Sequence, residues 1–280
     1  MKKILKCLFF LSVPLIAAAG VLYYYESLPV RGAFETRPVS YPTINKDELK
    51  AMLSQYNQRD LFEMYSAGLE TVKWQKLLSK VNATVVSDII KDLDEFFIGE
   101  RYPHDESVDR ETKSSYFYHS HRPKEHGHFH IYYSNKLVME KFKPITTWDK
   151  KHPNTHLVAI SMHPNGDPIG FFIPNHWITK DDWYVHEDMK EMFSQFRINH
   201  PYPSWPSNQW VSEMLKLFRP QIEHILKKRD EMLFNSDKPL DKIIKNKRLD
   251  VLASISISIS DQMSVIEELL GCNLANEVDK

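Results

Sequence analysis

Five of the thirteen histidines of this 280-residue chain lie between His119 and His130, in the segment His-Ser-His-Arg-Pro-Lys-Glu-His-Gly-His-Phe-His. Imidazole is the commonest ligand that proteins offer to zinc, copper and iron. Three or four ring nitrogens about 2.1 Å from one point can hold such an ion. The segment therefore predicts a site for a divalent transition metal: Zn, Fe or Cu. The candidate ligands are His119, His121, His128, His130 and His156.

Two predicted strands, residues 114–121 and 128–134, position these rings. Side chains alternate between the two faces of a strand, so each His-x-His pair shares a face. If His121 lies opposite His128 in an antiparallel pair, the other histidines of the two pairs also lie opposite each other. A shift by two residues keeps histidine opposite histidine, with Cβ atoms about 5 Å apart. The other face is predicted to pack on helices and carries Tyr116, Tyr118, Phe129, Ile131 and Tyr133.

Glu125 and His126, in the loop between these strands, are the candidate catalytic residues. The Glu125 carboxylate can bind the metal, orient a ligating imidazole from behind, or act as a general base. His156, and His176 in Asn175-His176-Trp177, can complete the ligand shell if their hairpin lies beside the first one. Two metal-free interpretations remain: histidines acting as acid, base or nucleophile, and a hydrogen-bonded sheet face without chemistry.

Asn165-Gly166 predicts that second hairpin, between residues 155–163 and 168–174. Asn-Gly between apolar runs favours a two-residue type I′ loop, in which both residues have positive φ. This loop would place Met162 opposite Ile169, Ile160 opposite Phe171, and Val158 opposite Ile173.

Helical spacing of apolar residues dominates the rest of the chain. The domain is therefore predicted to be an α+β domain over 46–280, with an antiparallel sheet of about four strands within 114–175 and helices packed against it. A polar loop is expected over 100–113, and the alternating Ser-Ile run 254–260 has the period of a strand. Helices are expected near 49–56, 61–72, 84–97, 189–196, 211–226 (interrupted by Pro220) and 261–270.

The N-terminal 26 residues have the pattern of an export signal. Three lysines precede an uncharged run over residues 7–25, which Glu26 ends and which is nearly long enough to cross a bilayer, so residues 5–25 are expected to lie in the lipid. The prediction is an uncleaved anchor in the lipid bilayer, with a cleaved signal peptide as the alternative and residues 27–45 as a linker. The remainder would then lie outside the cytoplasm, anchored to a bacterial inner membrane or secreted.

Composition excludes several classes of protein. With 36 basic and 37 acidic residues the net charge is −1, so nucleic acid is not an expected partner. The chain has eight glycines and lacks the glycine-rich runs that cradle phosphates. Its two cysteines, Cys7 and Cys272, cannot form a disulfide framework.

Residues 118–177 resemble an uncharacterised bacterial family, a domain of unknown function. The resemblance rests on the block from His119 to His130, on Thr155-His156-Leu157-Val158-Ala159, and on Asn175-His176-Trp177. It implies a shared site on a shared sheet and brings no activity.

Three functional hypotheses follow from the sequence. The first is an envelope protein with a metal site, a hydrolase or an oxygenase. The second is a non-catalytic interaction or scaffold protein of the envelope. The third is a phosphoryl or nucleotidyl hydrolase, because His126 to Tyr132 resembles the His-x-His-x-His signature of the histidine-triad hydrolases; Gly127 departs from the apolar residue expected there.

Overall fold

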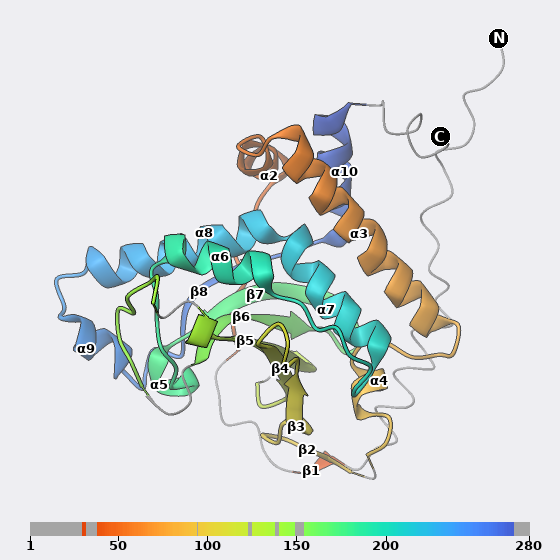
Figure 1. Cartoon of the computed structure of the whole chain (residues 1–280), viewed down its shortest axis with the longest axis horizontal. Coiled ribbons are helices and arrows are strands. Elements are labelled where there is room, and N and C mark those ends of the chain that lie inside the picture. The colour runs from red at the N-terminus through yellow and green to blue at the C-terminus, as the bar shows by residue number, and fades with distance from the viewer. Residues whose placement is uncertain are drawn as a thin grey trace.

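The computed structural model describes residues 30–31, 38–93, 95–122, 125–137, 140–148 and 154–271 (Figure 1). The predicted anchor or signal peptide over residues 1–26 lies outside them and stays a prediction. Among the helices of the described ranges, none combines the length and the hydropathy that crossing a bilayer requires.

A six-stranded antiparallel sheet forms the centre of the domain, which confirms the α+β class. Neighbouring strands in the sheet follow one another in chain order. Between the fifth and sixth strands the chain forms several helices. The sheet is larger than the four strands predicted because it gains a strand at each edge. The strands are β3 (Tyr102–Val108), β4 (Ser114–His119), β5 (Gly127–Ser134), β6 (Asn154–Met162), β7 (Pro168–Pro174) and β8 (Val251–Ser256).

The two edge strands explain where the sequence prediction was incomplete. Strand β3 was predicted to be a loop because its sequence is polar, but an edge strand exposes one side to water and needs no apolar alternation. Glu106, at φ 58°, interrupts its pairing with β4 between Tyr102 and Ser107. Strand β8 takes only the first part of the Ser-Ile run, which then enters a helix capped by the Ser258 side chain.

Helices cover one face of the sheet (Figure 1). Helix α8 contacts β7 and β8, while α3 packs on α7 and α10. Pro220 separates α7 from α8 as expected. The helix predicted over 84–97 is wrong: only one short helix forms there, and Phe96–Phe97 is strand β2, paired with β1 (Val30–Arg31). The helices are α2 (Lys46–Leu53), α3 (Gln58–Ser79), α4 (Ser87–Ile90), α5 (His176–Thr179), α6 (His186–Gln195), α7 (Trp205–Leu217), α8 (Arg219–Phe234), α9 (Leu240–Ile244) and α10 (Ile259–Leu270), with the 3₁₀ turn η1 (Asn135–Leu137).

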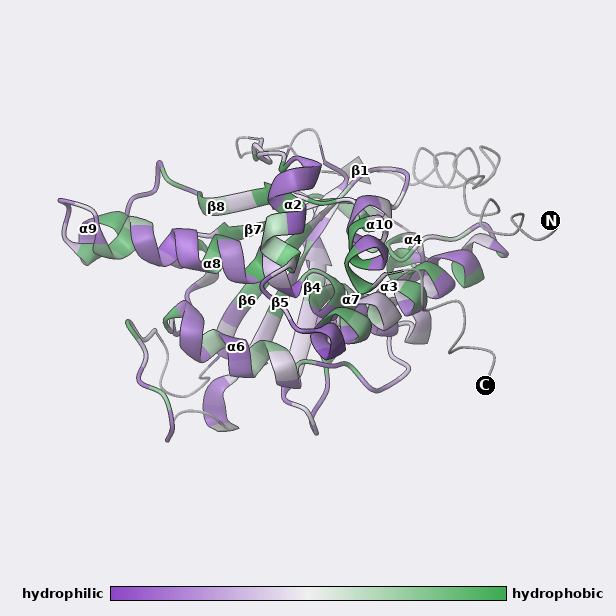
Figure 2. Cartoon of the chain, turned by 90° about the horizontal axis from the view of Figure 1, so that it is seen from above, coloured by the Kyte–Doolittle hydropathy of each residue, from purple (hydrophilic) through white to green (hydrophobic). Residues whose placement is uncertain are grey.

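The main core lies between these helices and the helix-facing side of the sheet. Figure 2 shows the contrast in hydropathy between strands β6 and β7 and the outer turns of α6 and α8. Trp210 of α7 is fully buried, with its ring centroid 5.9 Å from that of Phe129. All five residues predicted for this face, Tyr116, Tyr118, Phe129, Ile131 and Tyr133, are fully buried in the core.

The second hairpin has a different turn from the one predicted. His163 and Asp167 close a three-residue loop through a 2.8 Å backbone hydrogen bond, and of Asn165 and Gly166 only Gly166 has positive φ. The extra loop residue shifts the register near the turn, so Met162 pairs with Pro168 instead of Ile169. Further along, Ile160 lies opposite Phe171 as predicted.

Candidate metal centre

The pairing of β4 with β5 places histidines from both strands on the face that the helices leave uncovered. His119 lies opposite His128, so the register is shifted by two residues from the pairing first considered, and histidine still faces histidine. His130 lies beside Phe117 on one side and Ala159 on the other. Because the shift is even, the side-chain faces are unchanged.

Three ring nitrogens meet at one point in this cluster. His119 Nε2 lies 2.8 Å from His128 Nε2 and 3.0 Å from His130 Nε2. Ligand atoms of these three residues all lie within 4.8 Å of one another. Nitrogens bound at about 2.05 Å in a tetrahedral zinc site stand roughly 3.3 Å apart, so the two His119 distances would need to widen by only a few tenths of an ångström to admit an ion.

The far nitrogens of two of these rings have hydrogen-bond partners that fix their orientation. His128 Nδ1 lies 2.6 Å from Glu125 Oε1, and His130 Nδ1 lies 2.8 Å from His156 Nε2. Glu125 is itself held, since Ser161 donates a hydrogen bond to its Oε2 and Tyr41 Oη lies 3.4 Å from the same atom. An outer contact on Nδ1 that leaves Nε2 free is the usual arrangement around a metal-bound histidine.

Burial keeps the imidazoles of the cluster neutral. It holds the pKa values of His119, His128 and His130 well below 6.5, and the neighbouring histidines and Arg122 lower these pKa values further. Burial also lowers the pKa of His156 to about 3. Neutral imidazole is the form that binds a metal ion.

Neutral rings alone cannot satisfy both contacts of His119. An imidazole nitrogen either donates or accepts, along one direction in the ring plane. His119 Nε2 therefore cannot form hydrogen bonds to both His128 Nε2 and His130 Nε2. When His128 donates from Nδ1 to an ionised Glu125, its Nε2 carries only a lone pair. A cation shared by the three nitrogens satisfies all of them.

Aromatic rings and the N-terminal segment enclose the cluster. The Phe117 ring centroid lies 5.0 Å from that of His130, and the Phe172 centroid lies 5.1 Å from that of His128. The Tyr41 ring crosses β7 at Gly170, where a Cβ atom would lie only 2.4 Å from it. Gly170 is therefore needed for Tyr41 to lie on the sheet and reach Glu125.

Arg122 is the unexplained charge beside this cluster. Its side chain is 1% exposed, and the guanidinium lies 4.5 Å from the centroid of the Phe172 ring. None of its three side-chain nitrogens has a hydrogen-bond partner in the structure as described. Burial lowers the pKa of Arg122, while the nearby Glu125 raises it. A buried guanidinium without a hydrogen-bond partner is costly and calls for an explanation.

The other predicted site residues lie at different distances from the centre. The ring centroid of His121 is 4.6 Å from that of His119, and burial lowers its pKa to about 4, so it stands at the edge of the cluster. His156 supports His130. His126 turns away and packs against Tyr118 and Phe96 of the core, so the three alternating histidines of the histidine-triad pattern do not share a face. His176 lies elsewhere, against Trp148 and Trp183.

Several residues of the site were not identified from the sequence. Ser161 could have been found, because it lies directly opposite His128 in β6 once the strands are aligned. Tyr41 and Phe172 carry no sequence signal that links them to the histidines. Arg122 stood inside the histidine block, but nothing in the pattern indicated that its charge would be buried.

Comparison with known proteins identifies a family. The family model described as "Domain of unknown function (DUF6969)" matches residues 65–257, more than half of the chain. No curated protein and no solved structure matches.

Proposed function

The chain belongs to this family of domains of unknown function, and from its geometry we propose that it binds one divalent transition metal ion through His119, His128 and His130. The observation that supports this proposal is the convergence of three neutral Nε2 atoms that cannot satisfy one another by hydrogen bonding. Glu125 and His156 would hold the ligating rings from behind. His121 is placed to be a fourth ligand or to line the open side.

The proposed reaction class is metal-dependent hydrolysis or oxygenation. Three protein ligands leave at least one position on the ion for water, dioxygen or substrate, which is typical of catalytic sites. A zinc ion would supply an activated water, whereas iron or copper would supply redox chemistry. The rings of Phe117 and Phe172 keep bulk water away from the ligands. Which of the two reactions the site supports depends on which ion it binds.

Metal titration of the full-length protein tests the proposal. After chelation and dialysis, the protein is expected to bind one Zn²⁺, Cu²⁺ or anaerobic Fe²⁺ per chain. A micromolar or tighter dissociation constant is expected for at least one of them, together with a higher free energy of unfolding, because an ion that binds only the folded state stabilises it. Calorimetry and elemental analysis measure the stoichiometry. If none of the three ions binds at one per chain, the proposal is wrong.

Arg122 indicates the charge of the substrate. We propose that its unpartnered guanidinium binds an anionic group, a carboxylate or phosphate, of a molecule held at the metal. The metal-loaded protein is expected to bind acetate or inorganic phosphate at least about tenfold more tightly than Arg122→Met does. Arg122→Met should also raise the free energy of unfolding, since it removes a buried charge that forms no hydrogen bond. Equal anion affinity together with a lower free energy of unfolding in Arg122→Met would assign this residue a structural role instead.

A further inference from the structure

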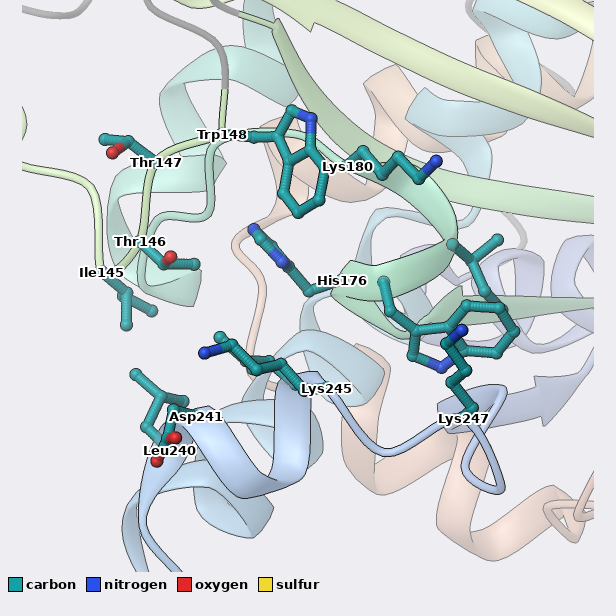
Figure 3. Close-up of a pocket in the computed structure, with 13 residues that line it drawn as sticks. Ile145, Thr146, Thr147, Trp148, His176, Lys180, Leu240, Asp241, Lys245 and Lys247 are labelled. Carbon is teal, nitrogen blue, oxygen red and sulfur yellow. The ribbon is translucent and has the colours of Figure 1, made fainter.

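A cavity of about 970 Å³ lies apart from the histidine cluster, between the segment 145–148, helix α5 and helix α9 with the turn that follows it (Figure 3). None of the proposed metal ligands lines it. Its volume is within the range of sites that bind small organic molecules, 300–1,000 Å³. Nothing described so far accounts for it.

The Asn175-His176-Trp177 motif builds one wall of this cavity and fixes the opposite one. Asn175 caps helix α5, and its Nδ2 donates hydrogen bonds to the carbonyl oxygens of Ile243, at 3.0 Å, and Leu249, at 2.9 Å. Trp177 Nε1 donates to the Leu249 oxygen as well, at 3.1 Å. The motif therefore holds both ends of the segment 243–249, which carries two of the cavity's lysines.

The charge of the lining favours an anion. Lys180, Lys245 and Lys247 line the cavity, and among the lining residues that the structure describes Asp241 is the one that is acidic. In Figure 3 the Lys245 amine points toward Ile145 and Thr146, across the cavity from α9. A concave surface with an excess of one charge raises the local concentration of the opposite charge.

His176 supplies a second, independent observation. Its side chain lines the cavity although the residue is only 4% exposed, and its Nε2 has no hydrogen-bond partner among the residues that the structure describes. A hydrogen bond with the backbone of Asp181 engages the ring, while burial lowers its pKa. A neutral ring held in this way offers Nε2 as an acceptor, and a buried acceptor without a donor lowers stability unless a ligand satisfies it.

The remaining walls are apolar and partly flat. Trp148 is 53% exposed, and its indole ring stands over His176 in a T-shaped contact at 5.5 Å (Figure 3). Ile145, Leu240 and Ile244 complete this side. An exposed indole beside apolar side chains suits the face of a planar molecule.

We propose that this cavity binds a small organic anion that has a flat apolar body and a hydroxyl or amine group. The positive charge of the lysines around the cavity attracts the acidic group, the apolar body lies against Trp148, and His176 Nε2 accepts a hydrogen bond from the hydroxyl or amine. This site is independent of the metal centre, so either proposal can fail without the other.

Calorimetric titration of the full-length protein with 6-hydroxy-2-naphthoate, whose hydroxyl is too far from its own carboxylate to bond with it, tests this site, with uncharged 2-naphthol for comparison. One saturable site is expected for the naphthoate, with at least about tenfold weaker binding of 2-naphthol. Lys245→Gln/Lys247→Gln should weaken naphthoate binding by a similar factor. Lys242→Gln is the control, because Lys242 is an exposed lysine of α9, the helix that ends directly before Lys245, and does not line the cavity.

His176→Phe keeps an aromatic ring at this position and removes the acceptor. It should therefore weaken the binding of the hydroxynaphthoate and leave the binding of 2-naphthoate, which lacks the hydroxyl, unchanged. Absence of saturable binding would overturn the proposal, as would equal affinity in the double lysine variant and the Lys242→Gln control. The exposed lysines are not part of the core, so this comparison remains valid even if His176→Phe fails to fold.

Discussion

Alanine at both His128 and His130 is expected to abolish stoichiometric metal binding by the full-length protein. The double variant leaves one nitrogen of the three that converge, that of His119, and a single imidazole binds divalent ions only weakly. Each single alanine variant should raise the dissociation constant by at least about 100-fold, more than the roughly 10–100-fold loss that follows removal of an outer partner. Calorimetric titration and elemental analysis provide the measurement.

The same titration separates ligands from the residue that positions them. Glu125→Gln keeps the shape of the side chain but loses the charge that holds His128 Nδ1–H. The metal affinity of this variant should therefore fall by roughly 10–100-fold. His104→Ala is the matched control, because His104 is an exposed histidine of the same sheet. If His104→Ala and His128→Ala bind metal equally well, the three-histidine centre is excluded.

Acidification of the metal-free protein from pH 7.5 to pH 5.5 is expected to lower its free energy of unfolding by at least roughly 3 kcal/mol. His128, His130 and His156 have depressed pKa values in the folded state, so below about pH 6.5 the unfolded chain takes up protons that the folded chain does not. Each such histidine lowers the free energy of unfolding by about 1.4 kcal/mol in total between pH 7.5 and pH 5.5. Their stabilising effect is present above pH 6.5 and is lost as the pH falls.

Two buried carboxyl groups raise the free energy of unfolding on acidification, but they are fewer than the histidines that lower it. Burial raises the pKa of Glu125, and it raises that of Asp181 to about 7, so both favour the folded state as the pH falls toward 4. Urea unfolding at three pH values in the presence of a chelator measures the balance. His128→Gln/His130→Gln should reduce the loss between pH 7.5 and pH 5.5 by about 2.7 kcal/mol. Stability that is constant or rises on acidification would show that these rings are already protonated in the folded protein.

The histidine face could be predicted from the sequence because strand parity depends on spacing alone. Any shift of the pairing by an even number of residues keeps His119 and His128 on one face. The error of two residues in the predicted pairing therefore did not change which side chains share a face. His126 was misplaced because it lies just before β5, where the alternation has not yet begun. The surroundings of the centre were out of reach, since Tyr41 and Phe172 come from distant segments that only the folded sheet brings together.

The outer elements show a similar division. Helices with strong apolar periodicity were found, whereas β3 was missed because an edge strand needs little apolar surface. The three-residue turn at Asn165-Gly166 was misassigned because its residue types suit more than one loop. The role of the Asn-x-Trp motif depends on carbonyl groups about 70 residues away in sequence, and no local pattern can reveal those.

The attachment of the segment that carries Tyr41 has a consequence for how the protein is made. Pro42 accepts a hydrogen bond from Ser256 N, and the Ser40 oxygen accepts one from the Ser254 hydroxyl, so this segment is anchored to β8. The ribosome completes the histidine hairpin at Ser134, long before it reaches Val251. Until that last strand joins the sheet, Tyr41 lacks the β8 contacts that hold its segment beside Glu125, so this side of the histidine cluster stays open to an incoming ion for longer than the side covered by Phe117 and Phe172.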